Sequence, residues 1–144
     1  GFQPAYEGTD NRCTLIEGAN GFRLPFEAEW EFAARGGDNY KYAGSDDVDE
    51  VAWYTKTTND KGTRPVGQKK VNNYNLYDFS GNVFEWCADD YDNPGQHVSG
   101  ASLRARRGGS WNYSANFCTV SVRSGSSPVK RNKSLGLRFS RSLE

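Results

Sequence analysis

Thiol and imidazole groups, which serve as nucleophiles, general bases and soft metal ligands, are scarce in this sequence: its only cysteines are Cys13, Cys87 and Cys118, and its only histidine is His97. The cysteines form no Cys-x-x-Cys pair, which excludes the usual zinc-finger and thioredoxin-like spacings. At least one thiol must be free because the number of cysteines is odd, and one long-range disulfide remains open. A single histidine excludes a three-histidine iron or zinc site and any relay that needs a second histidine. We expect His97, in a polar loop, to be solvated.

Cys118 closes the stretch WNYSANFC, which holds small polar and aromatic residues. Its thiol is either the nucleophile of an enzyme or a buried group beneath a binding surface. Tyr113 and Phe117 are typical of a binding surface, because such rings supply contact area while nearby Ser, Gly and Asn supply adaptable hydrogen bonds. Residues 111–135 are mostly loop-like, and a long loop in a compact domain is usually functional or disordered. An ordinary Ser- and Asn-rich surface loop is the alternative.

The stretch LPFEAEWEFAARGG predicts the clearest helix of the chain. Pro25 suits the first helical position, and Glu27 and Glu29 favour the positive end of the helix dipole. Gly36-Gly37 is a natural stop. Residues at helical spacing form one apolar face, which we expect to be core: Phe26, Trp30 and Ala33 or Ala34.

The rest of the chain predicts short strands and turns around this helix. The predicted strands are Cys13–Ile16, Pro65–Gly67, Val83–Cys87, Arg106–Trp111, Cys118–Arg123 and Leu135–Phe139. We also expect a turn at Asn72–Asn75 and a buried anchor at Val51–Tyr54. With 144 residues, no repeat and no linker, the chain predicts a single domain over residues 1–144. No apolar run is long enough to span a membrane, so we expect no direct membrane insertion by this chain.

The charges are segregated although the net charge is zero. Half of the 18 Lys and Arg residues lie in residues 93–143, which contain no Asp or Glu. A basic C-terminal third is compatible with a nucleic-acid or anionic partner. The basic residues are dispersed rather than clustered, however, which favours ion pairs with the acidic first part inside one fold. We therefore expect no nucleic-acid partner.

Four blocks resemble, in this order, the sulfatase-modifying-factor, or formylglycine-generating-enzyme-like, family: ANGFRLPFEAEWEFAARGG, RPVGQKKVNNYNLYDFSGNVFEWC, RARRGGSW and NKSLGLRFS. The resemblance covers roughly residues 10–140. It implies an α+β domain, the formylglycine-generating-enzyme variant of the C-type lectin fold, with little regular secondary structure. It also implies that the N-terminal part of the family domain is missing from this chain. We expect a cut-down piece of a longer precursor.

The oxidases of this family convert a substrate cysteine to formylglycine with a pair of active-site cysteines and copper. Carried onto this sequence, the two positions fall at Tyr113 and Cys118. A phenol replaces the first thiol, and one thiolate cannot supply two-thiolate coordination of a soft metal. We therefore expect no copper, no oxidase activity and no catalytic residues. Relatives that form sulfur–carbon bonds need three histidines, which this chain lacks.

A calcium site of the family lies near the LYD-x-SGNV-x-EW block. Carried over, its ligands are the Asp78 and Glu85 carboxylates and the Gly81 and Val83 carbonyls. Oxygen-only ligands suit a hard cation such as Ca²⁺. The alternative is that Asp78 caps a turn and Glu85 pairs with an arginine. The pattern of the family's other calcium site is not met near residues 58–60.

Other members of the family are variable proteins of diversity-generating retroelements, some displayed on bacterial surfaces, spirochaetes among them. These elements randomise template adenines, mostly in Asn codons, which never yields Lys, Gln, Glu, Met or Trp. The likeness to this type implies a ligand-binding region at about residues 104–140, formed by the reachable residues Tyr113, Ser114, Asn116, Phe117, Thr119, Ser121, Ser124, Gly125, Ser126, Ser127, Val129, Asn132 and Ser134. Between them stand template-fixed Lys130 and Lys133 and an expected framework of Trp111, Ala115, Cys118, Arg123, Pro128, Arg131, Leu135, Gly136 and Arg138.

The leading hypothesis is a non-catalytic, retroelement-diversified display protein that binds a macromolecular ligand, which we expect to be a protein. It implies an extracellular or cell-surface location through a segment outside this chain. A non-catalytic scaffold or sensor domain of the same family is the first alternative, and a formylglycine-generating oxidase is the second.

Overall fold

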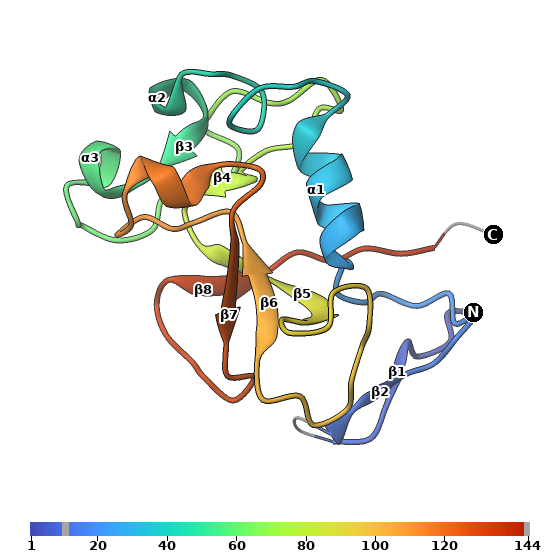
Figure 1. The fold of residues 1–144 in the computed structure, drawn as a ribbon. Helices are drawn as coiled ribbons and strands as arrows, with labels where there is room; N and C mark the ends of the chain where they lie inside the picture. Colours follow the sequence, from blue (N-terminus) through green and yellow to red (C-terminus); the bar gives the residue numbers. More distant parts are fainter. Residues whose placement is uncertain (10–11, 143–144) are drawn as a thin grey trace.

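Short helices and strands alternate with long irregular connections in the computed structural model (Figure 1). The structure describes residues 1–9 and 12–142; residues 10–11 and 143–144, which belong to the predicted domain 1–144, lie outside the described residues. Helices hold 16% and strands 21% of the chain. The predicted α+β class with little regular secondary structure is therefore confirmed.

A four-stranded sheet in the order β7-β6-β5-β8 lies at the centre of the fold. Its strands are β5 (Phe84–Asp90), β6 (Arg104–Arg107), β7 (Arg123–Ser126) and β8 (Leu135–Leu137). β6 pairs antiparallel with β5 and β7, whereas β8 runs parallel to β5, with Leu135 opposite Phe84. The connection between β7 and β8 therefore begins on one edge of the sheet and ends on the other (Figure 1).

Helix α1 (Glu27–Arg35) packs against β5 and β6. As the spacing predicts, Trp30 and Ala34 are buried on its inner face. Gly36 ends the helix in the left-handed region, at φ 61°, and its N–H donates a hydrogen bond to the Phe32 carbonyl. A residue with a β-carbon is strained in that region, which explains why the helix stops at the Gly-Gly pair.

The start of α1 differs from the prediction, because Pro25 is not its first helical residue. Phe26, with extended backbone at ψ 155°, is the N-cap, so the helix begins at Glu27. The Glu29 carboxylate accepts a hydrogen bond from the Phe26 N–H at 2.8 Å and satisfies an otherwise orphan donor. The Pro25 carbonyl accepts a hydrogen bond from the Ala88 N–H of β5, which ties the entry of the helix to the sheet.

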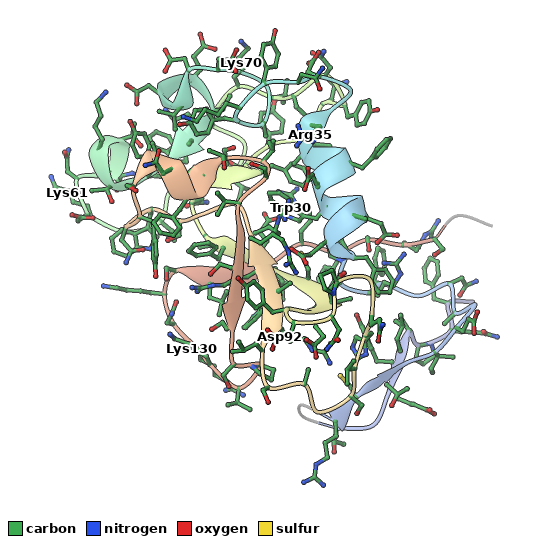
Figure 2. All side chains as sticks on the ribbon, viewed as in Figure 1. Trp30, Arg35, Lys61, Lys70, Asp92 and Lys130 are labelled. Atoms are coloured by element: carbon green, nitrogen blue, oxygen red, sulfur yellow. The ribbon has the colours of Figure 1, made fainter. Side chains whose placement is uncertain are left out.

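Two clusters of buried side chains form the core. The first lies between α1 and the sheet and comprises Trp30, Ala34, Ala43, Phe79, Cys87, Ala105 and Val120. Trp30 lies between the helix and the strands in Figure 2 and meets Phe79 edge-on, with 5.1 Å between ring centroids. The second cluster comprises Tyr42, Val51, Ala52, Tyr54 and Cys118, so the predicted anchor at residues 51–54 is confirmed.

The remaining short elements surround this core. α2 (Val48–Val51), β3 (Ala52–Trp53) and α3 (Thr55–Thr58) follow one another, and β3 pairs parallel with β4 (Ser80–Gly81). β1 (Tyr6–Glu7) pairs antiparallel with β2 (Thr14–Leu15), which lies inside the predicted strand Cys13–Ile16. At the predicted strand Pro65–Gly67 the structure has a turn and no strand.

The predicted turn at Asn72–Asn75 is confirmed, and the buried Asn72 side chain organises it. The Asn72 Oδ1 accepts hydrogen bonds from the Tyr74 and Leu76 N–H groups. Its Nδ2 donates to the Ala33 and Ala34 carbonyls at the end of α1. One side-chain amide thus provides hydrogen-bond partners both for backbone N–H groups of the turn and for C-terminal carbonyls of the helix.

Two predicted strands in the C-terminal third are misplaced. The strand expected at Arg106–Trp111 ends at Arg107, because Gly108 and Gly109 adopt φ 91° and 74°. The strand expected at Cys118–Arg123 is wrong: Ala115–Cys118 form a 3₁₀-helix, η2, and β7 begins only at Arg123. Smaller differences are that β5 extends to Asp90 and β8 ends at Leu137.

Ion pairs join the basic C-terminal third to the acidic first part, as one alternative predicts. Arg107 contacts Glu27 and Glu31, and Arg123 also contacts Glu27. Arg138 pairs with Glu85 across β8 and β5. These arginines hold the fold together and are not available to bind a polyanion. In the described part of the chain, no helix has the length and apolar character needed to cross a membrane.

Candidate ligand-binding surface

The surface is built around η2 and the turn that precedes it. Gly109, in the left-handed region, lets the chain approach η2 so closely that a β-carbon there would lie 2.8 Å from the Cys118 sulfur. Ser114 is extended before the first residue of η2, and Cys118 at the end of η2 is fully buried. η2 therefore turns its thiol inward, while Asn116 and Phe117 are exposed.

Three aromatic rings run from the core to this surface. Phe84 of β5 is buried, Tyr113 is half-buried, and Phe117 is 41% exposed. Tyr113 meets Phe84 edge-on at 5.0 Å between centroids and meets Phe117 edge-on at 5.1 Å. The Arg106 guanidinium covers the Phe84 ring at 4.2 Å. The outer two rings form an apolar platform that is fixed from below.

Backbone hydrogen bonds hold the turn in place. The Tyr113 carbonyl accepts from the Thr55 N–H at 3.1 Å, and the Trp111 carbonyl accepts from the Thr58 hydroxyl at 2.8 Å. The Cys118 carbonyl accepts from the Ser80 hydroxyl at 2.8 Å. These bonds use main-chain groups of the turn and buried framework side chains. The turn is thus positioned without the side chains that face solvent.

The β7–β8 connection lies beside this turn. Trp111 donates a hydrogen bond from Nε1 to the Lys133 carbonyl at 3.2 Å, and the Lys133 ammonium lies 5.0 Å from the Trp111 ring centroid. The Phe84 N–H donates to the Ser134 carbonyl at 2.9 Å. Trp111 and Phe84 therefore support both the turn at η2 and the β7–β8 connection.

The predicted ligand-binding residues divide into three groups by exposure. The exposed group is Ser114, Asn116, Phe117, Ser121, Val129 and Asn132. The half-buried group is Tyr113, Ser124, Gly125 and Ser127. Thr119, Ser126 and Ser134 are buried and so do not belong to the exposed surface. Asn132 has an internal role as well, since its Oδ1 accepts hydrogen bonds from the Ser134 N–H and hydroxyl.

Sequence reasoning omitted two residues that belong to this region. Asn112 is exposed within the turn and accepts a hydrogen bond from the Ser110 hydroxyl. Its residue type alone would have placed it in the reachable set. Phe84 is the base of the aromatic platform, and no local signal indicated that role, because Tyr113 is distant in the chain.

The expected framework residues are buried or half-buried, with one exception. Arg123 binds both Glu27 oxygens and the Tyr91 carbonyl, and the hydrogen bond to Glu27 raises the Arg123 pKa. Arg138 covers the Phe79 ring at 3.9 Å, and Trp111 is buried. Arg131 differs: it is exposed, so it belongs with the surface rather than with the framework.

The three thiols are all free, so no disulfide joins them. Cys118 is fully buried, and burial raises the pKa of its thiol to about 12. Burial also raises the pKa of Cys87 far above its ordinary range. Cys87 and Cys118 belong to different core clusters, and Cys13 is half-buried near the N-terminus. The thiolate is the reactive form, so Cys118 has the properties of a structural residue.

The expectation that His97 is solvated is wrong. Its ring is half-buried, 5.6 Å from the Tyr6 ring, and burial lowers its pKa. Its Nδ1 is buried without a hydrogen-bond partner in the described structure. His97 borders a small apolar cavity together with Cys13 and Cys87, but among the described residues no group of three His, Cys, Asp or Glu side chains could hold a metal ion.

The predicted calcium ligands fit a cation in part. Asp78, Val83 and Glu85 line one cavity, whereas Gly81 does not border it. Asp78 accepts a hydrogen bond from the Gly67 N–H, and Glu85 accepts from Arg138 and Trp30, as the alternative of a capped turn and an arginine pair predicts. Oε1 of Glu85 has a single donor, Arg138, and a carboxylate oxygen has two lone-pair positions, so it keeps capacity for a cation.

The sequence profile of the sulfatase-modifying factor enzyme 1-like domain matches residues 5–143. The chain belongs to this family. The resemblance found in its four sequence blocks is therefore confirmed.

Relatives in this family include enzymes and a protein described as inactive. The chain is 41% identical over 127 residues to chaperone protein LppX of Paenibacillus barcinonensis, which covers 75% of the chain and 45% of LppX. It is 38% identical over 135 residues to inactive C-alpha-formylglycine-generating enzyme 2 of Mus musculus, and this match covers 82% of the chain and 42% of that protein. It is 34% identical over 155 residues to the formylglycine-generating enzyme of Streptomyces coelicolor, and this match covers 89% of the chain and 49% of that enzyme. The chain thus spans about half the length of these family members.

Among solved structures, the chain is similar to Treponema denticola variable protein 1. The TM-score is 0.81 and the sequence identity 40%, over 90% of this chain and 50% of the variable protein. A protein described as a variable protein thus shares the fold of this chain. The expected likeness to a spirochaete variable protein is confirmed.

Proposed function

We propose that this chain is a non-catalytic ligand-binding domain whose C-terminal region is diversified by a retroelement and displayed at a cell surface. The observation that carries the proposal is the platform of Tyr113 and Phe117. Its rings are half-buried or exposed, yet its backbone is fixed by Thr55, Thr58 and Ser80. Such an arrangement tolerates changes of the exposed side chains, which a diversified surface requires.

The likeness to Treponema denticola variable protein 1 supports the proposal. The cysteines support it as well. Tyr113 stands where the family's oxidases have the first active-site cysteine, and its ring is packed between Phe84 and Phe117. Cys118, at the second position, is buried with a raised pKa. Two-thiolate coordination of copper cannot form from this pair, so the proposed domain does not oxidise a substrate cysteine.

The first test is a pair of libraries. One randomises the exposed or half-buried positions Tyr113, Asn116, Phe117 and Ser121; the matched control randomises the buried positions Thr119, Ser126 and Ser134. We expect most members of the first library to melt within a few degrees of the wild type and most members of the second to be destabilised. Equal destabilisation by both libraries would contradict a surface built for variation.

The second test concerns diversification and catalysis directly. Sequencing the gene across a population should show substitutions at the exposed positions, with Trp111, Lys130 and Lys133 unchanged, and a reverse transcriptase beside the gene. A uniform sequence without such an enzyme would support the scaffold or sensor alternative.

A CxPxR peptide incubated with the protein, copper and oxygen should yield no aldehyde. Aldehyde formation that Cys118→Ser abolishes would establish the oxidase.

A further inference from the structure

The β7–β8 connection carries three exposed positive charges: Lys130, Arg131 and Lys133. Among the described residues 1–9 and 12–142, no ion pair includes any of them, whereas Arg107, Arg123 and Arg138 are each paired with a glutamate. Residues 93–142 contain no Asp or Glu, so this part of the chain has no acid to neutralise them. We call Lys130, Arg131 and Lys133 the basic loop.

One end of the basic loop, Lys133, borders the aromatic platform. Lys133 lies over Trp111, the first residue of the turn that carries Tyr113. The residue after Lys133 accepts a hydrogen bond from the Phe84 N–H, and the Phe84 ring packs against Tyr113. A partner that covers the platform would therefore meet the Lys133 charge at its edge, and one that extends along the β7–β8 connection would meet Arg131 and Lys130 next.

α3 also contacts the platform, and the charges that follow it do not cancel the basic loop. α3 supports Tyr113 through Thr55, and the residues that follow α3 include exposed Asp60 and Lys61, one charge of each sign. Lys56 of α3 is paired with Asp49. The exposed charge around the platform is thus positive on balance.

We propose that the partner of this surface is an acidic protein segment, with carboxylates facing the basic loop and apolar groups covering Tyr113 and Phe117. This inference rests on the proposed function. Complementary charge at the rim speeds association and excludes partners of the same sign. Val129, 67% exposed, stands beside the charges, and an apolar side chain at that place suits a protein better than a phosphate backbone. A nucleic acid needs a larger basic area than three side chains provide.

The test uses fluorescent poly-L-glutamate as the probe, with poly-L-lysine and single-stranded oligothymidine for comparison. The variant Lys130→Gln/Arg131→Gln/Lys133→Gln removes the basic loop. A matched control, Arg12→Gln/Lys41→Gln/Arg141→Gln, removes the same charge from other exposed positions, none of which takes part in an ion pair in the described structure. We expect the loop variant to weaken poly-L-glutamate binding roughly tenfold at low salt, and the control by less than about twofold.

Other outcomes would overturn the inference. Equal loss in both variants, or no binding of poly-L-glutamate by the wild type, would show that the basic loop does not select acidic partners. Tighter binding of oligothymidine than of poly-L-glutamate would exclude the protein partner. A Tyr113→Ala/Phe117→Ala variant separates the two proposals. If only this variant weakens binding, the surface binds without the loop charges, so the inference fails and the proposed function stands; if neither variant weakens binding, both fail.

Discussion

The Glu27 carboxylate of α1 binds the Arg123 guanidinium of β7 through two of its oxygens, at 2.9 Å from Nε to Oε1 and 2.5 Å from Nη2 to Oε2. Arg107 of β6 donates to the same carboxylate at 3.2 Å. One glutamate therefore joins the helix to two strands of the sheet. β7 leads directly into the β7–β8 connection, so this carboxylate also anchors the strand from which that connection starts.

Glu27→Gln should destabilise the protein by about 3 kcal/mol, because the change removes one of the two carboxylates that neutralise the buried Arg107 and also the carboxylate that pairs with Arg123. Urea unfolding monitored by tryptophan fluorescence measures the loss. Glu50→Gln, which breaks the exposed pair with Lys70, is the matched control and should leave the unfolding midpoint nearly unchanged. Similar midpoints for the two variants would mean that the Glu27 network contributes little.

The pH dependence of stability should carry a signature of Glu29. The hydrogen bond from Arg23 holds the pKa of this carboxyl below its ordinary 4.5. Since the pKa is lower in the folded state, the pair stabilises the fold above the unfolded pKa and loses that effect as the pH falls through the folded pKa. We expect the melting temperature to fall between about pH 5 and about pH 3, and less steeply in Glu29→Gln. A variant that follows the wild-type curve would refute this assignment.

The thiols should react with an aromatic disulfide reagent in a fixed order. Cys13 is half-buried and should react first in the native protein, and Cys13→Ala should remove that phase. Cys87 and Cys118 are fully buried with raised pKa values and should react only on unfolding. Native reaction of Cys118 as fast as that of Cys13 would show that its thiol is accessible.

Calcium should raise the melting temperature of the wild type by a few degrees, since a ligand that binds only the native state stabilises it. Asp78→Asn should abolish the shift, because Asp78 supplies one of the two carboxylates at the cavity. Asp60→Asn, at an exposed acid away from that cavity, is the matched control and should retain it. A wild type that does not respond to calcium would exclude the site.

Local sequence patterns predicted those parts of the fold that depend on local interactions. Trp30 and Ala34 at helical spacing and the Gly-Gly stop identified α1, and Asn72 identified its turn. The placement of β7 could not be predicted in this way. Its four residues form a strand because they pair with β6, with Arg123 opposite Arg107, and Gly125 has no side chain that would indicate an extended conformation.

The same limit applies to the candidate surface. Residue types indicated Tyr113 and Phe117. The position of the Phe84 ring beneath them depends on contacts between distant parts of the chain, and so does the burial of Thr119, Ser126 and Ser134. His97 was misjudged for that reason, since its neighbour Tyr6 lies near the N-terminus. Contacts between segments that are distant in the sequence, rather than composition, decide which polar residues of this region face solvent.

The β7–β8 connection starts and ends in strands that are each paired to a different inner strand, with Ser126 held against Arg104 and Leu135 against Phe84. Its two ends are therefore pinned independently of what lies between them. The entropic cost of a longer connection grows slowly, by about 0.6 kcal/mol for each doubling of its length. A foreign peptide grafted between Ser127 and Lys130, whose backbones are joined by a turn hydrogen bond, should be carried as an insert on an otherwise unchanged domain. The molecule thus offers protein engineers a presentation scaffold that needs no disulfide.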